Sequence, residues 1–368
     1  MQDSDFARQL PEGPLAVAVS GGVDSLAALL LCLASGRRVF AIHARMWHGN
    51  SGDEARAREC EKRLADTVLR LGCDFQLVDL GQRFEECVVQ PFVQAWQKGL
   101  TPNPCALCNR RIKFGALWER AAELGAAALV TGHYASLDYN HPYRTRGPLL
   151  AQARDARKDQ AYFLGLVPGD MLSRVAFPLS RYTKDDVRAL VADSGLAVPQ
   201  PAESQEICFV PDTPQGYRDF LGRYGLNMPP GDIMERDSGK KVGRHTGLWQ
   251  YTEGQRHGLG IAWSEPLYVL EKEPSTNTLL VGGKRHTLIT RARANNLNLM
   301  VDADEIPRNC LVRLRYRQRP VPAKVHVEGG EMHIHCQTPL SLSAPGQVAA
   351  CYDEAGRLLG AGILQQLC

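Results

Sequence analysis

The chain is predicted to be an α/β protein with a doubly wound parallel sheet, a small central domain and a C-terminal antiparallel β-barrel. Strand-like apolar runs alternate with helical runs from residue 15 to residue 195, as in right-handed βαβ units. Glycine, proline and short strand-like pieces dominate residues 228–283. From Leu288 onward, short alternating strands and turn signals at 328–330 and 353–356 predict an antiparallel barrel or sandwich. The domains are expected to span residues 1–212, 213–285 and 286–368.

Length and composition describe an ordinary globular protein. A chain of 368 residues has room for two or three domains, and a net charge of +3 neither indicates nor excludes nucleic-acid binding. Residues 1–13 are polar and lack the basic and apolar segments of a secretory signal. The longest apolar run, residues 26–34, is too short to cross a bilayer. We therefore expect a cytoplasmic protein without membrane association.

The elements of the first domain are expected in alternating order. Strands are predicted at residues 15–19, 39–44, 75–80 and 127–132. Helices are predicted at residues 26–34, 53–71, 84–96 and 108–124. Residues 138–147 should form a loop, and a later helix, capped by Thr183 with Asp186, should end near Gly195. Because ligands bind at the carboxyl ends of parallel strands, the segment after residue 19, Ala44 and Gly132-His133 should converge.

The segment Ser20-Gly21-Gly22-Val23-Asp24-Ser25 joins the first predicted strand to the first helix. A helix N-terminus offers free N–H groups to a phosphate, both glycines can take positive φ, and the two serines add hydroxyl donors. Asp24 would repel an anion, so we expect Mg²⁺ between its carboxylate and the phosphates. An ordinary capped turn is the alternative. However, the string lacks the lysine of a Walker A loop and the G-x-G-x-x-G of a dinucleotide fold. It resembles the pyrophosphatase-type loop of enzymes that split ATP between the α and β phosphates.

A C-x-x-C pair, Cys105 and Cys108, follows two prolines at the predicted start of a helix. The helix N-terminus and the nearby Arg110, Arg111 and Lys113 should favour thiolate over thiol. Such a pair can be a nucleophile, a redox pair or two metal ligands, but a structural zinc site needs further ligands that the spacing does not offer. Cys208 lies between proline-rich breaks and is expected on a loop, with an ordinary buried cysteine as the alternative.

Three thiols permit two kinds of sulfur chemistry. One cysteine can carry sulfur as a persulfide that a second cysteine resolves by disulfide exchange. Alternatively, three thiolates can hold a [4Fe–4S] cluster and leave one iron open for sulfide. The other cysteines are expected to be small apolar fillers or, for the last, a chain end: Cys32, Cys60, Cys73, Cys87, Cys310, Cys336, Cys351 and Cys368.

Seven motifs together resemble the bacterial tRNA-specific 2-thiouridylase family. They are SGGVDS (20–25), TPNPCALCN (101–109), GHY (132–134), KDQAYFL (158–164), SQEICF (204–209), YTEGQRHGLGI (251–261) and RYRQ (315–318). The resemblance runs from Leu15 to the end of the chain and implies a PP-loop ATP pyrophosphatase domain, with an adenine nucleotide α-hydrolase-like sheet. It also implies a transferase that adenylates the C2 oxygen of the wobble uridine (U34) of tRNA. Sulfur from a cysteine persulfide or a cluster-bound sulfide then gives 2-thiouridine, and AMP and pyrophosphate are released.

The same resemblance implies partners, cofactors and site residues. The partners are the anticodon loop of tRNA and an upstream sulfur-donor protein; the cofactors are ATP and Mg²⁺, with the [4Fe–4S] cluster as the open alternative. The implied ATP site comprises Ala18, Val19, Ser20, Gly21, Gly22, Val23, Asp24, Ser25, Ala44 and Gly132. The implied tRNA contacts are Asn103, Pro104, Cys105, His133, Lys158, Asp159, Gln160, Arg315, Tyr316 and Gln347. Cys108 matches the catalytic nucleophile and Cys208 the persulfide-bearing cysteine, and both should face the pocket of the Ser20 loop together with Cys105.

Two positions depart from the family's pattern. Ala44 stands where a methionine is expected, a change that a backbone contact with ATP would survive. Cys105 stands where many members have an aspartate that could act as a general acid or base. A cysteine there provides an auxiliary thiol or completes a three-cysteine ligand set. It also permits a Cys105–Cys108 disulfide in an oxidised sample.

Four arginines, Arg313, Arg315, Arg317 and Arg319, alternate at period two. We expect them on one face of a strand, as a phosphate track for tRNA rather than an ordinary solvated face. Two other functions remain open from the residues alone. Amide-forming or lysidine-type ligases share such ATP loops but do not need three thiols. An iron–sulfur or zinc-stabilised RNA-binding protein would bind tRNA without consuming ATP.

Overall fold

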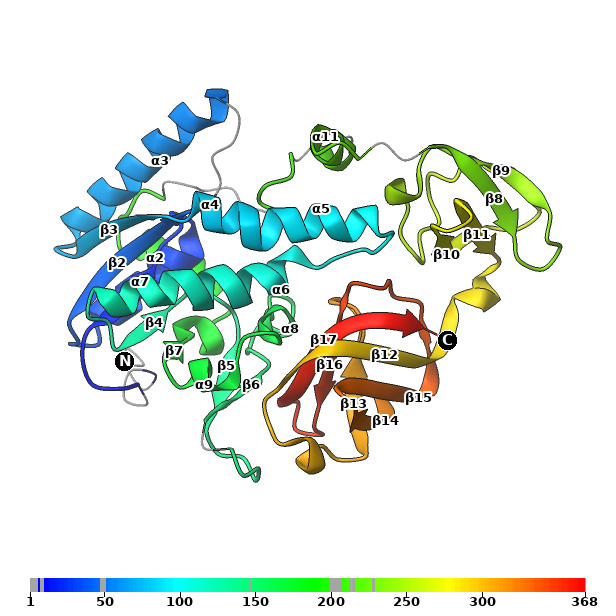
Figure 1. Ribbon diagram of the computed structural model, residues 1–368. Helices are drawn as coiled ribbons and strands as arrows, with labels where there is room; N and C mark the ends of the chain where they lie inside the picture. Colours follow the sequence, from blue (N-terminus) through cyan, green and yellow to red (C-terminus); the bar gives the residue numbers. More distant parts are fainter. Residues whose placement is uncertain are drawn as a thin grey trace.

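The computed structural model describes residues 6, 10–46, 51–145, 147–198, 207–211, 213, 216–226 and 229–367. An α/β unit (β1 to α10) is followed by a central sheet (β8 to β11) and a barrel (β12 to β17), as Figure 1 shows. The predicted α/β class, parallel sheet and C-terminal barrel are confirmed. Residues 204–206 of the SQEICF string, and Asp212 at the expected domain boundary, lie outside the described residues.

The α/β unit is built on a parallel sheet with the strand order β3–β2–β1–β4–β7. Its strands are β1 (Leu15–Ala18), β2 (Val39–Arg45), β3 (Asp74–Asp79), β4 (Ala128–Val130) and β7 (Val175–Ala176). The first four lie where the sequence predicts them, whereas the two residues of β7 are too few for any periodic signal. Val17 pairs with Ala41 of β2 and Val130 of β4, so the segments that follow β1, β2 and β4 leave the same edge of the sheet.

Helices cover both faces of this sheet (Figure 1). Leu15 and Val17 pack with α2 (Val23–Leu33), α3 (Ser51–Arg70) and α10 (Lys184–Asp193), whereas Ala16 packs on the opposite side with α7 (Leu117–Glu123). Successive residues of a strand point to opposite faces, which is why a parallel sheet buried on both faces needs a continuous apolar run. The predicted capping box of α10 is confirmed, because Asp186 N donates to Thr183 Oγ1 at 3.2 Å and Thr183 N donates to Asp186 Oδ2 at 2.8 Å.

The helix that carries the C-x-x-C pair starts at Pro104, four residues before the predicted start. It runs through α6 (Pro104–Cys108), a π-helical segment (Asn109–Ala116) and α7. Asn103 caps it, since its side-chain oxygen accepts from Ala106 N at 3.1 Å, and Pro104 occupies the first turn, where no N–H is needed. Cys105 and Cys108 are three residues apart and therefore lie on one face of the helix. The predicted helix 84–96 also contains a π segment (Glu85–Val89), between α4 (Gly81–Phe84) and α5 (Gln90–Gln97).

The remaining elements of the first 226 residues are short. The predicted loop 138–147 connects β5 (Ser136–Asp138) to β6 (Leu149–Ala151), which pair antiparallel. Then follow α8 (Ala161–Leu164), α9 (Gly169–Leu172), a 3₁₀ turn (Pro178–Arg181) and, after α10, α11 (Gly216–Arg223).

The central sheet and the barrel complete the chain. The central sheet has the order β10–β11–β8–β9, with β8 (Gly231–Glu235), β9 (Lys241–His245), β10 (Tyr268–Glu273) and β11 (Thr278–Gly282). The barrel closes in the order β12–β15–β14–β13–β16–β17. Its strands are β12 (Leu288–Leu299), β13 (Asn309–Arg313), β14 (Val321–Glu328), β15 (Glu331–Ser341), β16 (Val348–Tyr352) and β17 (Leu358–Leu367). No helix among the described residues is long and apolar enough to cross a membrane.

The prediction that the four arginines share one face of a strand is wrong. Strand β13 ends at Arg313, and the chain turns directly afterwards, because Gln318 N donates to Arg315 O at 3.1 Å. The period-two spacing therefore falls on a β13–β14 connection rather than on one strand face. Arg313 lies near Asp159, with 3.9 Å between guanidinium nitrogen and carboxylate oxygen, while Arg315, Arg317 and Arg319 are exposed.

Thr101, just before the cysteine helix, contacts all three parts of the molecule. Its N–H donates to Pro345 O of the barrel at 2.8 Å, and its carbonyl accepts from Gln347 Nε2 at 2.7 Å. From the central sheet, Lys272 Nζ donates to Thr101 Oγ1 at 3.2 Å. Gly346 lies so close that a Cβ there would come within 3.0 Å of the Thr101 carbonyl oxygen. The start of the cysteine helix is thus held by the barrel and the central sheet.

We predict that Tyr162→Phe weakens the contact between the α/β unit and the barrel. Tyr162 is fully buried, and its hydroxyl donates to Val348 O of β16 at 2.7 Å. Loss of one buried hydrogen bond should lower the free energy of unfolding by about 1–2 kcal/mol in urea titrations. Tyr139→Phe is the matched control, because Tyr139 is 38% exposed. Its effect should stay within about 0.5 kcal/mol. Equal losses in both variants would contradict the assignment.

Candidate functional site

The Ser20–Ser25 loop connects β1 to α2 and presents the N-terminus of that helix. Gly21 has a φ of +85°, as predicted, but the prediction for Gly22 is wrong, since its φ is −81°. Gly22 instead occupies the N-cap position of α2 in an extended conformation. A glycine has no side chain to cap the first turn, so the N–H groups of that turn remain available to an anion.

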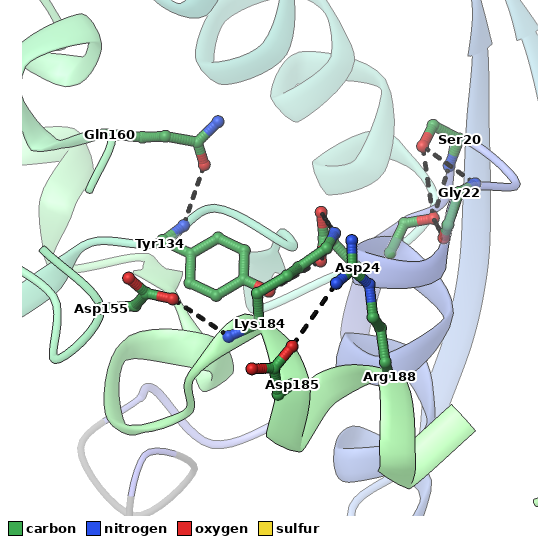
Figure 2. Close-up of polar contacts among 10 residues, drawn as sticks. Ser20, Gly22, Asp24, Tyr134, Asp155, Gln160, Lys184, Asp185 and Arg188 are labelled. Atoms are coloured by element: carbon green, nitrogen blue, oxygen red, sulfur yellow. Dashed lines mark hydrogen bonds and ion pairs between the residues drawn. The ribbon is translucent and has the colours of Figure 1, made fainter. Parts of the chain in front are cut away.

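The two serines of the loop have different roles. Ser25 Oγ donates to Gly22 O at 2.9 Å and accepts from Ser20 N at 3.1 Å, which holds the loop closed on itself (Figure 2). Ser25 is buried, whereas Ser20 is exposed. Ser25 therefore fixes the loop, and Ser20 is placed to reach a ligand.

Asp24 is neutralised by a lysine that the sequence analysis did not single out. Lys184 Nζ lies 2.8 and 2.9 Å from the two carboxylate oxygens of Asp24, and Tyr134 Oη donates to the same carboxylate at 2.8 Å. Figure 2 shows these groups converging beside the loop, with the Arg188 side chain also extending from α10 toward Asp24. The Lys184 side chain is only 6% exposed. Lys184 is the first residue of α10, where a positive charge is unfavourable because it opposes the helix dipole. This unfavourable placement is the one sequence feature that could have indicated a functional lysine.

The contacts of Asp24 with Lys184 and Tyr134 affect whether this carboxylate can bind the expected Mg²⁺. Both oxygens of Asp24 already accept from Lys184 and one also accepts from Tyr134, so three of the four lone pairs of this carboxylate are in use. Lys184 places a positive charge beside Asp24, where Mg²⁺ is expected from the sequence. No group of three His, Cys, Asp or Glu side chains among the described residues is arranged to hold a metal ion. Mg²⁺ therefore stays a prediction.

The implied ATP-binding residues outside the loop line the same edge of the sheet. Val19 N donates to Ile42 O at 2.9 Å, which places Val19 beside the end of β2, where Ala44 lies. Gly132 follows β4 and packs directly on α2. A Cβ at Gly132 would lie 2.8 Å from both the carbonyl carbon and the carbonyl oxygen of Asp24. This close contact between Gly132 and the backbone of α2 explains why position 132 requires glycine.

His133 links this edge to the cysteines. Lys113 Nζ lies 3.3 Å from His133 Nε2, and His133 Nδ1 lies 2.8 Å from Thr131 Oγ1. Because an ammonium group only donates, Nε2 accepts and Nδ1 carries the proton that is donated to Thr131. Burial, reinforced by the charge of Lys113, holds the pKa of His133 well below its usual range. His133 is thus a neutral imidazole at pH 7.

The three expected thiols lie within electrostatic range of one another and of Lys113. Negative charge on Cys208 or Cys105 would raise the pKa of Cys108, whereas the charge of Lys113 lowers the pKa of all three thiols. Phe209 anchors the Cys208 segment, because its ring packs 5.2 Å from Phe92 and 5.6 Å from Phe84, centroid to centroid. That aromatic cluster also contains Cys108. The structure therefore places Cys105 and Cys108 on one helix face and packs Phe209, the residue after Cys208, into the cluster that contains Cys108, and the contact between Lys113 and His133 connects this helix to the edge where the Ser20 loop lies.

The expectation of stabilised thiolates is wrong for this conformation. Burial raises the pKa of Cys108 to about 12, and it also raises the pKa of Cys105 and Cys208. Cys108 is 8% exposed, whereas Cys105 and Cys208 reach solvent, so desolvation matters most for Cys108. Loss of hydration outweighs the helix N-terminus and Lys113. All three are free thiols here, and Cys105 and Cys108 form no disulfide.

Most of the implied tRNA-contacting residues lie where the barrel meets the α/β unit. Asn103 caps the cysteine helix, Gln160 accepts from Tyr134 N at 3.0 Å, and Tyr316 Oη donates to Asp159 O at 3.0 Å. Gln347 donates to the Thr101 carbonyl, and Asp159 and His133 are buried. Pro104 is buried, Lys158 is half-buried and Arg315 is exposed. Asn103, Gln347 and His133 contact the cysteine helix or the residues just before it, and several of the implied tRNA contacts already have intramolecular partners.

Family models match nearly the whole chain. A model described as a tRNA methyl transferase HUP domain matches residues 14–212. A tRNA methyl transferase PRC-barrel domain matches residues 218–283, and an aminomethyltransferase beta-barrel domain matches residues 289–364. A tRNA-specific 2-thiouridylase of Nitratidesulfovibrio vulgaris is 45% identical over 95% of this chain and 98% of its own. One of Lawsonia intracellularis is 41% identical over the same shares.

The chain belongs to the tRNA-specific 2-thiouridylase family. Membership confirms the resemblance drawn from the seven motifs, and with it an enzyme of the tRNA-modifying transferase class. A solved U34-tRNA thiolase from Methanococcus maripaludis, with its [4Fe–4S] cluster, matches with a TM-score of 0.35 and 15% identity over 59% of this chain and 69% of that chain. A likeness at that level carries no argument about the chemistry of this member of the 2-thiouridylase family.

We predict that Gly132→Ala weakens ATP binding about tenfold or more. The added methyl group would displace the first turn of α2, because it would lie 2.8 Å from the Asp24 backbone. Titration calorimetry with ATP measures the effect. Gly222→Ala in α11 is the control, since a Cβ there meets no atom within 4 Å. An unchanged ATP affinity in Gly132→Ala would show that ATP binding by the loop does not depend on the close contact between Gly132 and Asp24.

We predict that alkylation of Cys108 in the free enzyme is slow at pH 7 and keeps rising through pH 10. The reactive thiolate is scarce far below the pKa of about 12 and grows with each step in pH toward it. Lys113→Gln should slow alkylation further, because removal of the cation raises that pKa. Mass spectrometry of the Cys108 peptide after timed iodoacetamide treatment gives the rates. A plateau near pH 8 would refute the buried-thiol assignment.

Proposed function

We propose that this family member converts the wobble uridine (U34) of tRNA into 2-thiouridine, using ATP to activate the base and cysteine sulfur to replace its oxygen. One observation carries the proposal. A helix N-terminus suited to phosphate and three thiols are connected through Gly132, His133 and Lys113. Relatives named tRNA-specific 2-thiouridylase support the substrate over nearly the full length of the chain.

In the activation step the C2 oxygen of the uracil attacks the α phosphorus of ATP, and pyrophosphate leaves. The base then carries AMP on oxygen, which turns a poor leaving group into a good one. The chain contributes position and charge through the free N–H groups of α2 and the Ser20 hydroxyl, while Lys184 neutralises Asp24 beside them. Mg²⁺, when bound with ATP, would add charge neutralisation to these groups.

In the sulfur step Cys208 carries a persulfide. The thiolate of Cys108 attacks the inner sulfur of the persulfide, so that a Cys108–Cys208 disulfide forms and hydrosulfide is released. The hydrosulfide attacks C2 of the adenylated uridine, and AMP departs with the original oxygen. A thiol reductant must then reduce the disulfide before the next turnover. Lys113 stabilises the Cys108 thiolate, since its charge lowers the pKa of that thiol.

A cluster route is the second candidate, and Cys105 is the observation that favours it. Cys105 lies one turn before Cys108 on the same helix face and within electrostatic range of Cys208. The three cysteines are the residues that would hold a [4Fe–4S] cluster. As they lie, they do not form a ready ligand set among the described residues.

The proposal also covers partners and location. The target base must leave the anticodon stack to reach the thiols, and a base in a single-stranded loop does so at the lowest cost. A sulfur-donor protein has access to Cys208, whose side chain is exposed. We place the enzyme in the cytoplasm, with domains at residues 1–212, 213–285 and 286–368.

The two routes predict different outcomes for three cysteine variants. In the persulfide route, Cys108→Ser and Cys208→Ser abolish 2-thiouridine formation, whereas Cys105→Asp retains it within about tenfold, because an acid can serve beside the nucleophile. In the cluster route all three variants lose both activity and iron. The measurements are nucleoside mass spectrometry and an iron count on anaerobically purified protein. Pyrophosphate release that does not depend on tRNA would reject the function itself.

A further inference from the structure

The outer face of the barrel carries an ordered set of basic and imidazole side chains, here called the barrel patch. It comprises Arg291 and Arg293 on β12, His333 and His335 on β15, Lys324 and His326 on β14, and Arg308 just before β13. Strand pairing arranges six of them as two rows across three strands: Arg291–His335–Lys324 and Arg293–His333–His326. Their neighbours along each strand, such as Ala292, Val325 and Ile334, are buried in the barrel. The patch side chains therefore point outward.

The two rows differ in how their charge is balanced. Near the β14–β15 turn, Glu331 lies 3.6 Å from Arg293 and 3.8 Å from His333, and Glu328 lies 3.3 Å from His326. In the other row, and within the part of the chain that the structure describes, neither Arg291 nor Lys324 has a carboxylate within ion-pair distance. The same holds for the adjacent Arg308. All three side chains are exposed. The patch thus holds three cations without an acidic counterpart.

The patch also forms a hollow of about 560 Å³. It shares no residue with the Ser20 loop or the cysteines. The barrel is joined to the α/β unit through β16 and β17. The Tyr162 hydroxyl donates to Val348 O of β16, and β17 contacts β6. Strands β14 and β15 lie on the side of the barrel farther from that unit (Figure 1).

The side-chain chemistry favours a polyphosphate backbone over a protein. Guanidinium groups bind phosphate oxygens in a bidentate manner, and lysine and imidazole add single donors. Protein interfaces are built around buried aromatic and aliphatic anchors, yet among the described residues no exposed large apolar side chain lines this hollow. Nucleic-acid interfaces are instead polar and positively charged.

We infer that the barrel patch is a second tRNA-binding surface, which holds the sugar–phosphate backbone of the substrate away from the target base. The inference rests on the proposed function for the identity of the RNA. Contacts of this kind position an RNA without reading its sequence. The patch therefore adds affinity for the body of the tRNA, while the α/β unit acts on the base.

The test is charge reversal in the full-length protein, with Arg291→Glu and Lys324→Glu combined. We expect affinity for whole, unmodified tRNA to fall by about tenfold at low salt, and the slope of log K against log [salt] to become shallower by about 1–2, one for each lost phosphate contact. ATP affinity should not change. A second double variant, Arg291→Gln with Lys324→Gln, should show the same reduction in slope with a smaller loss of affinity.

The control is a charge reversal on α3, Arg56→Glu with Lys62→Glu, which changes the net charge by the same amount. Both residues are exposed and lie far from the barrel in sequence. Its tRNA affinity should exceed that of the patch variant. An unchanged affinity and slope in the patch variants, with tRNA-dependent pyrophosphate release intact in the parent, would overturn the inference. Equal losses in patch and α3 variants would overturn it too, since only net charge would then matter. Absence of tRNA-dependent release in the parent would instead overturn the proposed function.

Discussion

The fixed position of Thr101 is the constraint on which the cysteine helix depends. Barrel, central sheet and α/β unit meet there through backbone and side-chain hydrogen bonds, and the helix with Cys105 and Cys108 begins three residues later. Asn103 and Pro104 set the direction of that helix, and nine residues further on Lys113 ties it to His133 at the sheet edge. A helix held at both points positions its thiols through the whole protein rather than through one domain.

Two lysines organise the charge of the site. Lys184 neutralises Asp24 beside the N-terminus of α2, and Lys113 contacts His133 and lowers the pKa of the Cys108 thiol. Both are partly or fully enclosed by protein, where a charge acts over a longer range than in water. The Ser20 loop and the cysteine helix thus each have a lysine side chain beside them. The neutral His133 adds no competing charge between them.

Local patterns in the sequence were enough to predict the strands β1 to β4, the Ser20 loop, the capping box at Thr183 and a barrel at the C-terminus. Contacts between distant segments could not be predicted in this way. Lys184 lies 160 residues from Asp24, and nothing near either residue states that they pair. The arginines from 313 to 319 show the opposite error, because a strand-like period fell on a turn. The raised pKa of Cys108 also depends on the Phe84–Phe92–Phe209 cluster, which no local motif encodes.

The burial of Cys108 has a consequence for the chemical durability of the enzyme. Peroxide and other electrophiles attack thiolates far faster than thiols, so a sulfur kept protonated in an apolar setting is a poor target for oxidative damage. The resting protein therefore protects Cys108, the nucleophile of the proposed sulfur step. In the proposed sulfur step this protection has a cost in speed, because the thiolate that the fold otherwise suppresses must form first.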